Sequence, residues 1–371
     1  LGSLTTGNAN TAVGKDTLSQ LTTVSDMVAV GFKALEANTT GTHNTAVGAF
    51  SSDAITTGIR NTSLGYGTLT SGTSINYNTA LGYAALADCS SDSNTGVGHA
   101  ALTAMTTGGQ NTAVGNGAGD AITTAGGNTI MGSLAGSALT TGSGITCFGL
   151  DAGNVCTNSG NTFIGYEAGE LVTTGYNNTF VGEDAGDTTT TGYGNTCIGI
   201  NTQTSISNAE KQIVIGYDYT GNGDNKVNLG SANGYVWNSY TVNNTWTQVS
   251  DERTKKNIES DDLGLEFINE LRPVTFNWKH SSEIDPEFIE ETVNIGRGEK
   301  DTETLIHGLI AQEVKAAMDA VGNTTFNGWE EGQDGQAVSR EMFITPLIKA
   351  VQELSAEVTT LKSEIAALKG G

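Results

Sequence analysis

Residues 44–48 read NTAVG, and seventeen positions later residues 61–65 read NTSLG. This pattern of Asn-Thr, a small or apolar residue, a large apolar residue and Gly recurs, with substitutions, at spacings of 16 or 17 through residue 216. Its glycines are Gly14, Gly31, Gly48, Gly65, Gly82, Gly98, Gly115, Gly132, Gly149, Gly165, Gly182, Gly199 and Gly216. A fixed period of this length is typical of a solenoid, in which each repeat forms one coil that stacks on its neighbours.

The composition of each repeat favours short β-strands. Thr and large apolar residues are bounded by Gly, Asn and Thr-Thr-Gly turns, and helices would need far less Gly and Thr. The repeated Asn, as at Asn61 and Asn78, is expected to stack into a ladder of amides that hydrogen-bond along the axis. At about 4.8 Å per coil, the repeats predict a rod of about 60 Å.

The repeats are of two kinds. Four residues after the repeat glycine, earlier repeats carry leucine and later repeats carry glycine. The leucines are Leu18, Leu35, Leu69, Leu86 and Leu102, and the glycines are Gly119, Gly136, Gly153, Gly169 and Gly186. We expect the loss of one leucine per coil to change the cross-section, or the subunit contacts, near residue 110.

The composition changes after residue 249. Of the 50 glycines, 40 precede this point, and all three prolines follow it, which predicts a domain boundary. Residues 231–249 break the period and contain two tryptophans. We expect them to cap the apolar end of the solenoid; stacking of their aromatic rings on sugars is the alternative.

After the boundary, the sequence predicts a mixed α/β module. Residues 261–273 are expected to form a helix that ends at Pro273, residues 274–278 a strand, and residues 307–322 a strand followed by a helix. The last segment has apolar residues alternately three and four apart, which is typical of a coiled coil. They are Ile344, Leu347, Val351, Leu354, Val358, Leu361, Ile365 and Leu368.

The expected architecture is therefore mainly β. A solenoid shaft (1–230) and a cap or neck (231–249) precede a small α/β domain (250–340) and a C-terminal coiled coil (341–371). Taken alone, β-branched residues alternating with leucine along the seam favour two strands.

Charge and motifs exclude several functions. The net charge of −23 disfavours nucleic acid and anionic membranes as partners. No cofactor motif occurs and the four histidines are scattered, so no cofactor or metal is expected.

The four cysteines, without C-x-x-C spacing, are predicted to be buried free thiols. No apolar run reaches the length of a membrane span, and the start within a repeat suggests part of a longer protein.

Four motifs occur in order after residue 249: SDERTKKNI (250–258), LRPVTFNW (271–278), HGLIAQEV (307–314) and PLIKAVQELSAEV (346–358). Together they resemble the intramolecular chaperone auto-processing domain at the C-terminus of endosialidase-type tailspikes and phage tail fibres. The preceding repeats resemble trimeric bacterial adhesin heads and phage fibre shafts.

The resemblance implies a chaperone that assembles the fibre as a homotrimer and then removes itself as an autoproteolytic serine peptidase. Ser250 would be the nucleophile, Lys255 the general base, and the cut would fall between Val249 and Ser250. A serine needs such a base to attack near neutral pH, and a lysine serves only when burial or nearby positive charge, here Arg253 and Lys256, favours its neutral form. The alternative is that this segment is only a charged turn.

The resemblance also implies a location in the virion tail, assembly in the host cytoplasm, and a host-surface glycan or protein as receptor, beside other tail proteins. A shared threefold symmetry of fibre and chaperone favours three strands in the coiled coil. His307, Gln312 and Glu313 are expected to have structural roles.

Two other functions stay open. A polysaccharide depolymerase would need a carboxylate pair across a cleft, such as Glu183 with Asp187 or Glu167 with Glu170. Solvated turn charges are the simpler interpretation of these residues. The second alternative is a bacterial trimeric adhesin head.

Overall fold

The computed structural model describes residues 5–232, 234–240, 247–248, 252–279, 303–332 and 335–370. The chain divides into two units, Leu1–Ser250 and Asp251–Gly371, and each has a hydrophobic core of its own. The finer fourfold division expected from the sequence stays a prediction.

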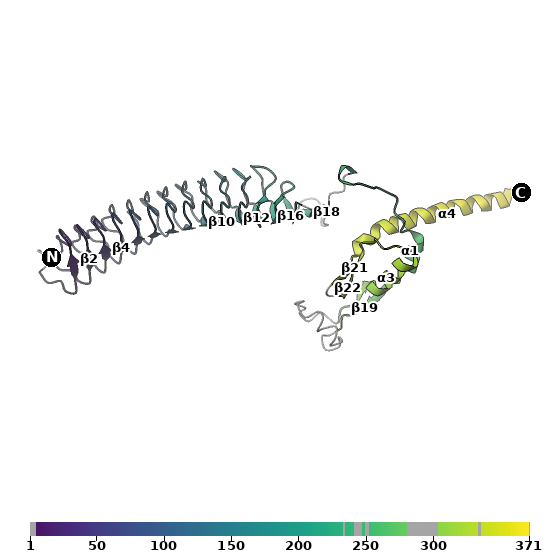
Figure 1. The fold of residues 1–371 in the computed structure, drawn as a ribbon, viewed down its shortest axis with the longest axis horizontal. Helices are drawn as coiled ribbons and strands as arrows, with labels where there is room; N and C mark the ends of the chain where they lie inside the picture. The colour runs from purple at the N-terminus through teal and green to yellow at the C-terminus, as the bar shows by residue number, and fades with distance from the viewer. Residues whose placement is uncertain are drawn as a thin grey trace. The chain divides into compact units, whose positions relative to one another are not determined.

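The first unit is a β-solenoid in which each 17-residue repeat contributes one short strand (Figure 1). Its first twelve strands are β1 (Thr11–Val13), β2 (Val28–Val30), β3 (Thr45–Val47), β4 (Thr62–Leu64), β5 (Thr79–Leu81), β6 (Thr95–Val97), β7 (Thr112–Val114), β8 (Thr129–Met131), β9 (Thr146–Phe148), β10 (Thr162–Ile164), β11 (Thr179–Val181) and β12 (Thr196–Ile198). They pair in parallel and in chain order, with repeat-equivalent residues opposite each other. The solenoid predicted from the period is confirmed.

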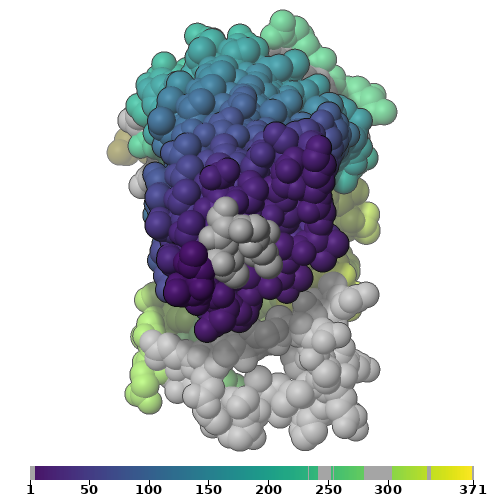
Figure 2. Space-filling model, turned by 90° about the vertical axis from the view of Figure 1, so that its left-hand side faces the viewer, coloured from purple at the N-terminus to yellow at the C-terminus, as the bar shows by residue number. Residues whose placement is uncertain are grey.

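Viewed from its N-terminal end, the solenoid shows its first coils in front of the later ones (Figure 2). In each strand the second residue points into the coil and the first and third point outward, as the strand alternation requires. In β3, for example, Ala46 is buried between the half-buried Thr45 and Val47. The large apolar residue before each repeat glycine therefore lies on the outer surface.

The predicted asparagine ladder is confirmed. Nδ2 of Asn61 donates to Oδ1 of Asn44 (3.1 Å) and to the carbonyl oxygen of Ile75 (2.7 Å), while Oδ1 of Asn61 accepts the backbone N–H of Asn78 (3.1 Å). The side chains are fully buried, so each amide satisfies backbone groups of the adjacent coil that water cannot reach. Met27 and Ile145 take the asparagine position in two coils and interrupt the ladder there.

The repeat glycine is required by the stacking distance. At Gly115 the backbone has φ +146°, and a Cβ there would lie 2.2 Å from the carbonyl oxygen of Gly132 in the next coil. In the other coils, a Cβ added to the repeat glycine would lie 1.7–2.4 Å from the carbonyl oxygen of the corresponding glycine in the next coil. No side chain fits at this corner of the coil, which explains why the glycine recurs.

The exchange of leucine for glycine is compensated within the cross-section. Leu86 and Gly186 occupy the same left-handed corner, with φ +54° and +73°. Where leucine fills the core, the second strand residue is small, as at Gly96, whose added Cβ would meet the Leu86 side chain at 3.0 Å. Where the corner is glycine, a large strand residue fills the space, and a Cβ on Gly186 would lie 2.2 Å from the Phe180 ring. The core thus stays packed in both kinds of coil, although the side chain that fills it comes from a different position of the repeat.

The C-terminal end of the solenoid leaves the repeat pattern. Its strands are β13 (Thr202–Gln203), β14 (Ile213–Tyr217), β15 (Tyr219–Thr220), β16 (Lys226–Ser231), β17 (Gly234–Ser239) and β18 (Thr247–Gln248). After β16 the order becomes antiparallel, with β17 paired along the full length of β16. Tyr235 of β17 packs against the solenoid core, and its ring lies 4.9 Å from that of Tyr219. Strand β17 therefore covers the open edge of β16, which is the last strand in the parallel order.

The second unit contains η1 (Glu252–Thr254), α1 (Leu265–Glu270), β19 (Val274–Phe276), β20 (Ile306–Gly308), α3 (Ala311–Ala320), β21 (Trp329–Gly332), β22 (Gly335–Val338), η3 (Arg340–Phe343) and α4 (Ile344–Gly370). The predicted order of helix, strand, strand and helix is confirmed, but α1 is shorter than the helix expected over 261–273, and β19 ends at Phe276 rather than at residue 278. Its core centres on three mutually packed rings, Phe267, Phe326 and Phe343, with centroids 5.0–6.1 Å apart. In the described ranges, no helix is both long and apolar enough to cross a membrane.

Candidate functional site

The predicted nucleophile, Ser250, and its neighbour Val249 lie outside the described residues. Lys255 follows η1, and its backbone N–H donates to the carbonyl oxygen of Glu252 (3.0 Å). The side chains of Arg253 and Lys255 are exposed in the single chain. The pairing of Ser250 with Lys255 therefore stays a prediction.

His307 lies within a short two-stranded sheet, and Gln312 and Glu313 lie in the first turn of α3, which follows it. His307 of β20 pairs with Thr275 of β19, and its side chain is exposed. Glu313 forms a two-pronged ion pair with Arg272, in which Nε donates to Oε2 (3.1 Å). This hydrogen bond lowers the pKa of Glu313 and raises that of Arg272. The LRP and QEV motifs thereby join the end of α1 to the start of α3.

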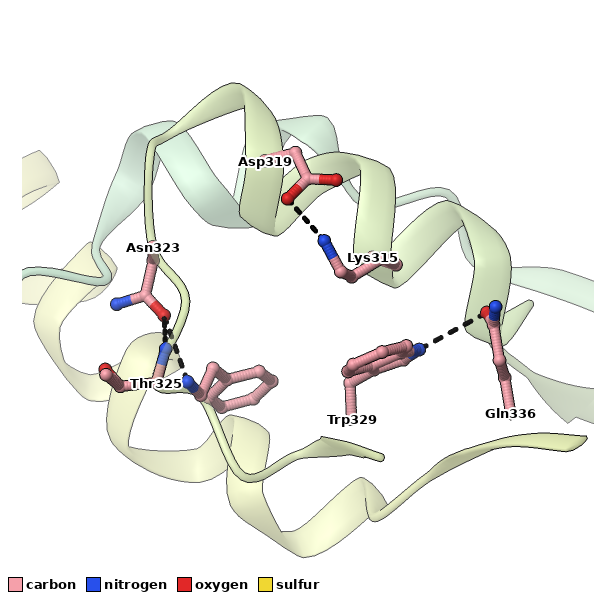
Figure 3. Close-up of polar contacts among 7 residues, drawn as sticks. Lys315, Asp319, Asn323, Thr325, Trp329 and Gln336 are labelled. Carbon is pink, nitrogen blue, oxygen red and sulfur yellow. Dashed lines mark hydrogen bonds and ion pairs between the residues drawn. The ribbon is translucent and has the colours of Figure 1, made fainter. Parts of the chain in front are cut away.

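The turn after α3 is fixed by Asn323 (Figure 3). Its Oδ1 accepts the backbone N–H groups of Thr325 and Phe326, both at 3.0 Å, and its Nδ2 donates to Asp262 (3.2 Å). These bonds hold Phe326 in the core. The aromatic ring of Trp329, on the next strand, lies 5.6 Å from Nζ of Lys315.

Glu353 connects α4 to α1. Its carboxylate accepts the backbone N–H of Leu265, at the start of α1, at 2.7 Å, and lies 3.5 Å from Lys349. The backbone hydrogen bond is the main cause of the lowered pKa of Glu353. The C-terminal helix is thus attached to the module along the side that carries Glu353.

The predicted coiled-coil seam lies on another side of α4 and is exposed. Its eight apolar side chains, from Ile344 to Leu368, are 40–83% exposed in the single chain. Beside its first turn is a surface groove of about 470 Å³, lined chiefly by Ile268, Leu271, Leu309 and Phe343 together with Leu347 of the seam. An exposed apolar row of this kind marks an interaction surface.

The solenoid has its own apolar row, formed by the third residue of each strand. Val13, Leu64 and Phe148 are 46–58% exposed, and the corresponding residues of the other strands are exposed or half-buried. A second row on coils 2–6 consists of rings whose centroids are 5.2–5.7 Å apart. These rings are Phe32, Phe50, Tyr66, Tyr83 and His99.

The carboxylates considered for glycoside cleavage lie in two adjacent coils. Burial raises the pKa of Asp187, and the neighbouring charges of Asp184 and Glu167 raise it further. Burial and the same crowding raise the pKa of Glu170. Glu183 is exposed. Like charges are stacked here from coil to coil, and this raises carboxyl pKa values whether or not a cleft is present.

All four cysteines are free and buried, as predicted. Burial raises the pKa of the Cys89 and Cys156 thiols, so they are poor nucleophiles. Within the described ranges, no three His, Cys, Asp or Glu side chains are grouped so as to hold a metal ion.

Three of the four motifs lie in one segment that matches a known family. Residues 250–323 match the chaperone of endosialidase. The match begins at Ser250, includes Lys255 and HGLIAQEV, and ends before α4. Together with the 17-residue solenoid, it agrees with the tail fibre or tailspike and C-terminal intramolecular chaperone that the sequence suggested. No curated protein and no solved structure matches the chain.

Sequence reasoning missed the outward row of the solenoid and the cap that Glu353 supplies to α1. Two consecutive apolar residues in a three-residue strand do not reveal which one points inward. The Glu353 contact spans 88 residues and leaves no local signal.

Proposed function

We propose that this chain is the host-attachment segment of a phage or prophage tail fibre. In this proposal, its C-terminal module gathers three copies and then cleaves itself off between Val249 and Ser250. The observation that carries the proposal is the exposed seam of α4, which follows directly after a module of the endosialidase chaperone family.

The seam supports association of chains because its eight apolar side chains are 40–83% exposed in the single chain. Burying an apolar side chain of this size gains roughly 1.5–3 kcal/mol. Eight such side chains, at coiled-coil spacing, would drive association of several helices. The outer row of the solenoid supports lateral contact between the rods in the same assembly.

The repeats explain why such a rod needs a chaperone. Each coil presents nearly the same strand and the same asparagine to its neighbours, so a slip between two chains by one repeat keeps most contacts. Parallel pairing between distant segments is also slow and exposes open sheet edges. A unique C-terminal helix bundle would set the register before the rods associate.

The cleavage would proceed as an acyl shift followed by hydrolysis. Oγ of Ser250 attacks the carbonyl carbon of Val249, Lys255 accepts the hydroxyl proton, and the departing backbone nitrogen of Ser250 takes up a proton. Water then hydrolyses the ester, which leaves a carboxylate at Val249 and an amine at Ser250. Lys255 is exposed in one chain, so the proposal requires neighbouring chains to cover it. Cleavage would then follow correct assembly.

The cleavage is tested by intact mass after folding. The parent chain should give two fragments, ending at Val249 and beginning at Ser250. Ser250→Ala and Lys255→Ala should each remain 371 residues long and still form trimers. Lys279→Ala, a lysine outside the four motifs, should cleave. A parent chain that stays intact would refute the cleavage and leave the chaperone role standing.

The attachment role is tested by competition. Released rods, added in excess to host cells before infection, should reduce phage adsorption by occupying the glycan or protein receptor. Unchanged adsorption with trimeric rods would argue against a receptor-binding function for this segment.

A further inference from the structure

The heptad phase of α4 separates its own-domain face from its free face. With Ile344 at position a, Pro346 and Ala350 fall at c and g and are buried, and Glu353 at c contacts α1. The a and d residues are exposed, and so is Ile348 at e. Each helix therefore packs on its own module through the c/g side and presents the a/d/e side to other chains.

The charges of the later heptads fix how two such helices can meet. Glu357 and Glu364 fall at g, and Lys362 and Lys369 fall at e. In a parallel, in-register coiled coil, a g residue lies beside the e residue five positions later in the neighbouring chain. This places Glu357 beside Lys362 and Glu364 beside Lys369 of a second copy. An antiparallel pair would instead bring like charges together.

The same rule, applied one heptad earlier, reaches the groove. Continued backward from Ile344, the g phase falls on Phe343, the last residue of η3, and the e residue five positions later is Ile348. Phe343 lines the groove together with Leu271, Leu309 and Leu347. In the parallel arrangement, the side chain facing Phe343 is therefore Ile348 of the neighbouring copy. Ile348 is the one apolar residue at an e position of this helix; the later ones are Ser355, Lys362 and Lys369.

We propose that the groove between α1, β20 and the start of α4 is completed by Ile348 of a second copy of this chain. The inference rests on the proposed assembly and adds a specific contact to it. Each module would hold the helix of its neighbour, so that α1 and the HGL strand are tied to oligomer formation. The match in charge sign at g and e, and the continuity of groove and seam through Leu347, identify the occupant as a second copy.

The contact is tested with two single-cysteine chains of full length that are folded together. One carries Ile348→Cys and the other Leu271→Cys, both in the Ser250→Ala background to prevent cleavage. After mild oxidation and blocking of free thiols, a denaturing gel without reductant should show a cross-linked pair. The four native cysteines are buried in the solenoid, and the Ser250→Ala parent controls for them. Thr345→Cys, at the outward b position of the same turn, should give at least tenfold less cross-link with Leu271→Cys.

The native mass of each mixture distinguishes the groove contact from the assembly as a whole. Trimers without the Ile348–Leu271 cross-link, or with equal cross-linking from Thr345→Cys, would overturn this contact and leave the proposed assembly intact. Monomers in the Ser250→Ala parent would overturn both.

A second comparison uses charge. Ile348→Lys is harmless in a single chain because the residue is exposed, but it would bury a charge in the assembled groove. It should raise the concentration needed for trimers at least tenfold. Ser355→Lys, at the same heptad position one heptad later, should change it less than threefold. Equal effects would contradict the groove assignment.

Discussion

The solenoid and the C-terminal module use hydrogen bonds in opposite ways. In the solenoid, polar contacts recur every 17 residues, and each coil is interchangeable with the next. In the module, each contact is unique: Glu353 reaches Leu265 across 88 residues, and Asn323 reaches Asp262 across 61. Repetition of one short sequence pattern builds a long rod, but it does not define the register between two such rods. The module has no such repetition, and this difference supports the proposal that the module, rather than the rod, sets the register between chains.

The largest effect is expected where the repetition is broken at a stacking glycine. Gly115→Ala would place a methyl group 2.2 Å from the Gly132 carbonyl oxygen at a left-handed φ, so adjacent coils must separate. We expect a loss of more than about 4 kcal/mol of solenoid stability, measured by thermal unfolding.

Gly127→Ala is the matched control. Gly127 also has a left-handed φ, but a Cβ there meets nothing within 4 Å, so the cost should be only about 1–2 kcal/mol. Equal losses in the two variants would show that backbone strain, rather than coil spacing, selects the repeat glycine.

A second pair of variants compares satisfied and unsatisfied asparagines. Asn61→Ala leaves the backbone N–H of Asn78 and the carbonyl of Ile75 without their amide partner, at a cost of about 1–3 kcal/mol. Asn38 is equally buried, but both polar atoms of its side chain lack a partner, and Leu21 and Ile55 hold its position in the adjacent coils. Asn38→Leu should therefore stabilise the solenoid. Destabilisation by Asn38→Leu in denaturant titrations would refute this distinction.

In the module, removal of the Glu353 carboxylate should loosen α1 from α4. Glu353→Gln keeps the shape but weakens the charge-assisted bond to the Leu265 N–H. Amide hydrogen exchange in α1 should become faster, while exchange in the solenoid is unchanged. Thr360→Ala, at the same heptad position one heptad later, should leave exchange in α1 as in the parent chain.

The smallest effect concerns pH. The folded-state pKa values of Glu170 and Asp187 are raised above those of the unfolded chain, so the unfolded state ionises first. Stability should therefore fall as pH rises from about 4 through the raised values. Asp187→Asn should raise Tm of the solenoid at pH 7 by about 1–3 °C and flatten this dependence. A Tm that is lower at pH 7 in Asp187→Asn would contradict the assignment.

Much of this architecture could be predicted from sequence because its causes are periodic. The glycine spacing, the asparagine ladder and the heptads of α4 each repeat a local requirement many times. The exchange between Leu86 and Phe180 as core fillers was not predicted, because it depends on a corner position and a strand position, six to ten residues apart, that fill the same space. The catalytic assignment of Ser250 and Lys255 rests on a motif, since a nucleophile and its base leave no periodic signal.

The central claim is that the module and α4 assemble three chains. The most direct test is the native mass of the full-length Ser250→Ala chain, folded and measured by light scattering. We predict three times the 38.3 kDa of one chain, with Leu354→Lys in the seam reducing it to a monomer. A stable monomer or dimer of the Ser250→Ala chain, over the concentrations at which the fibre is made, would contradict the account.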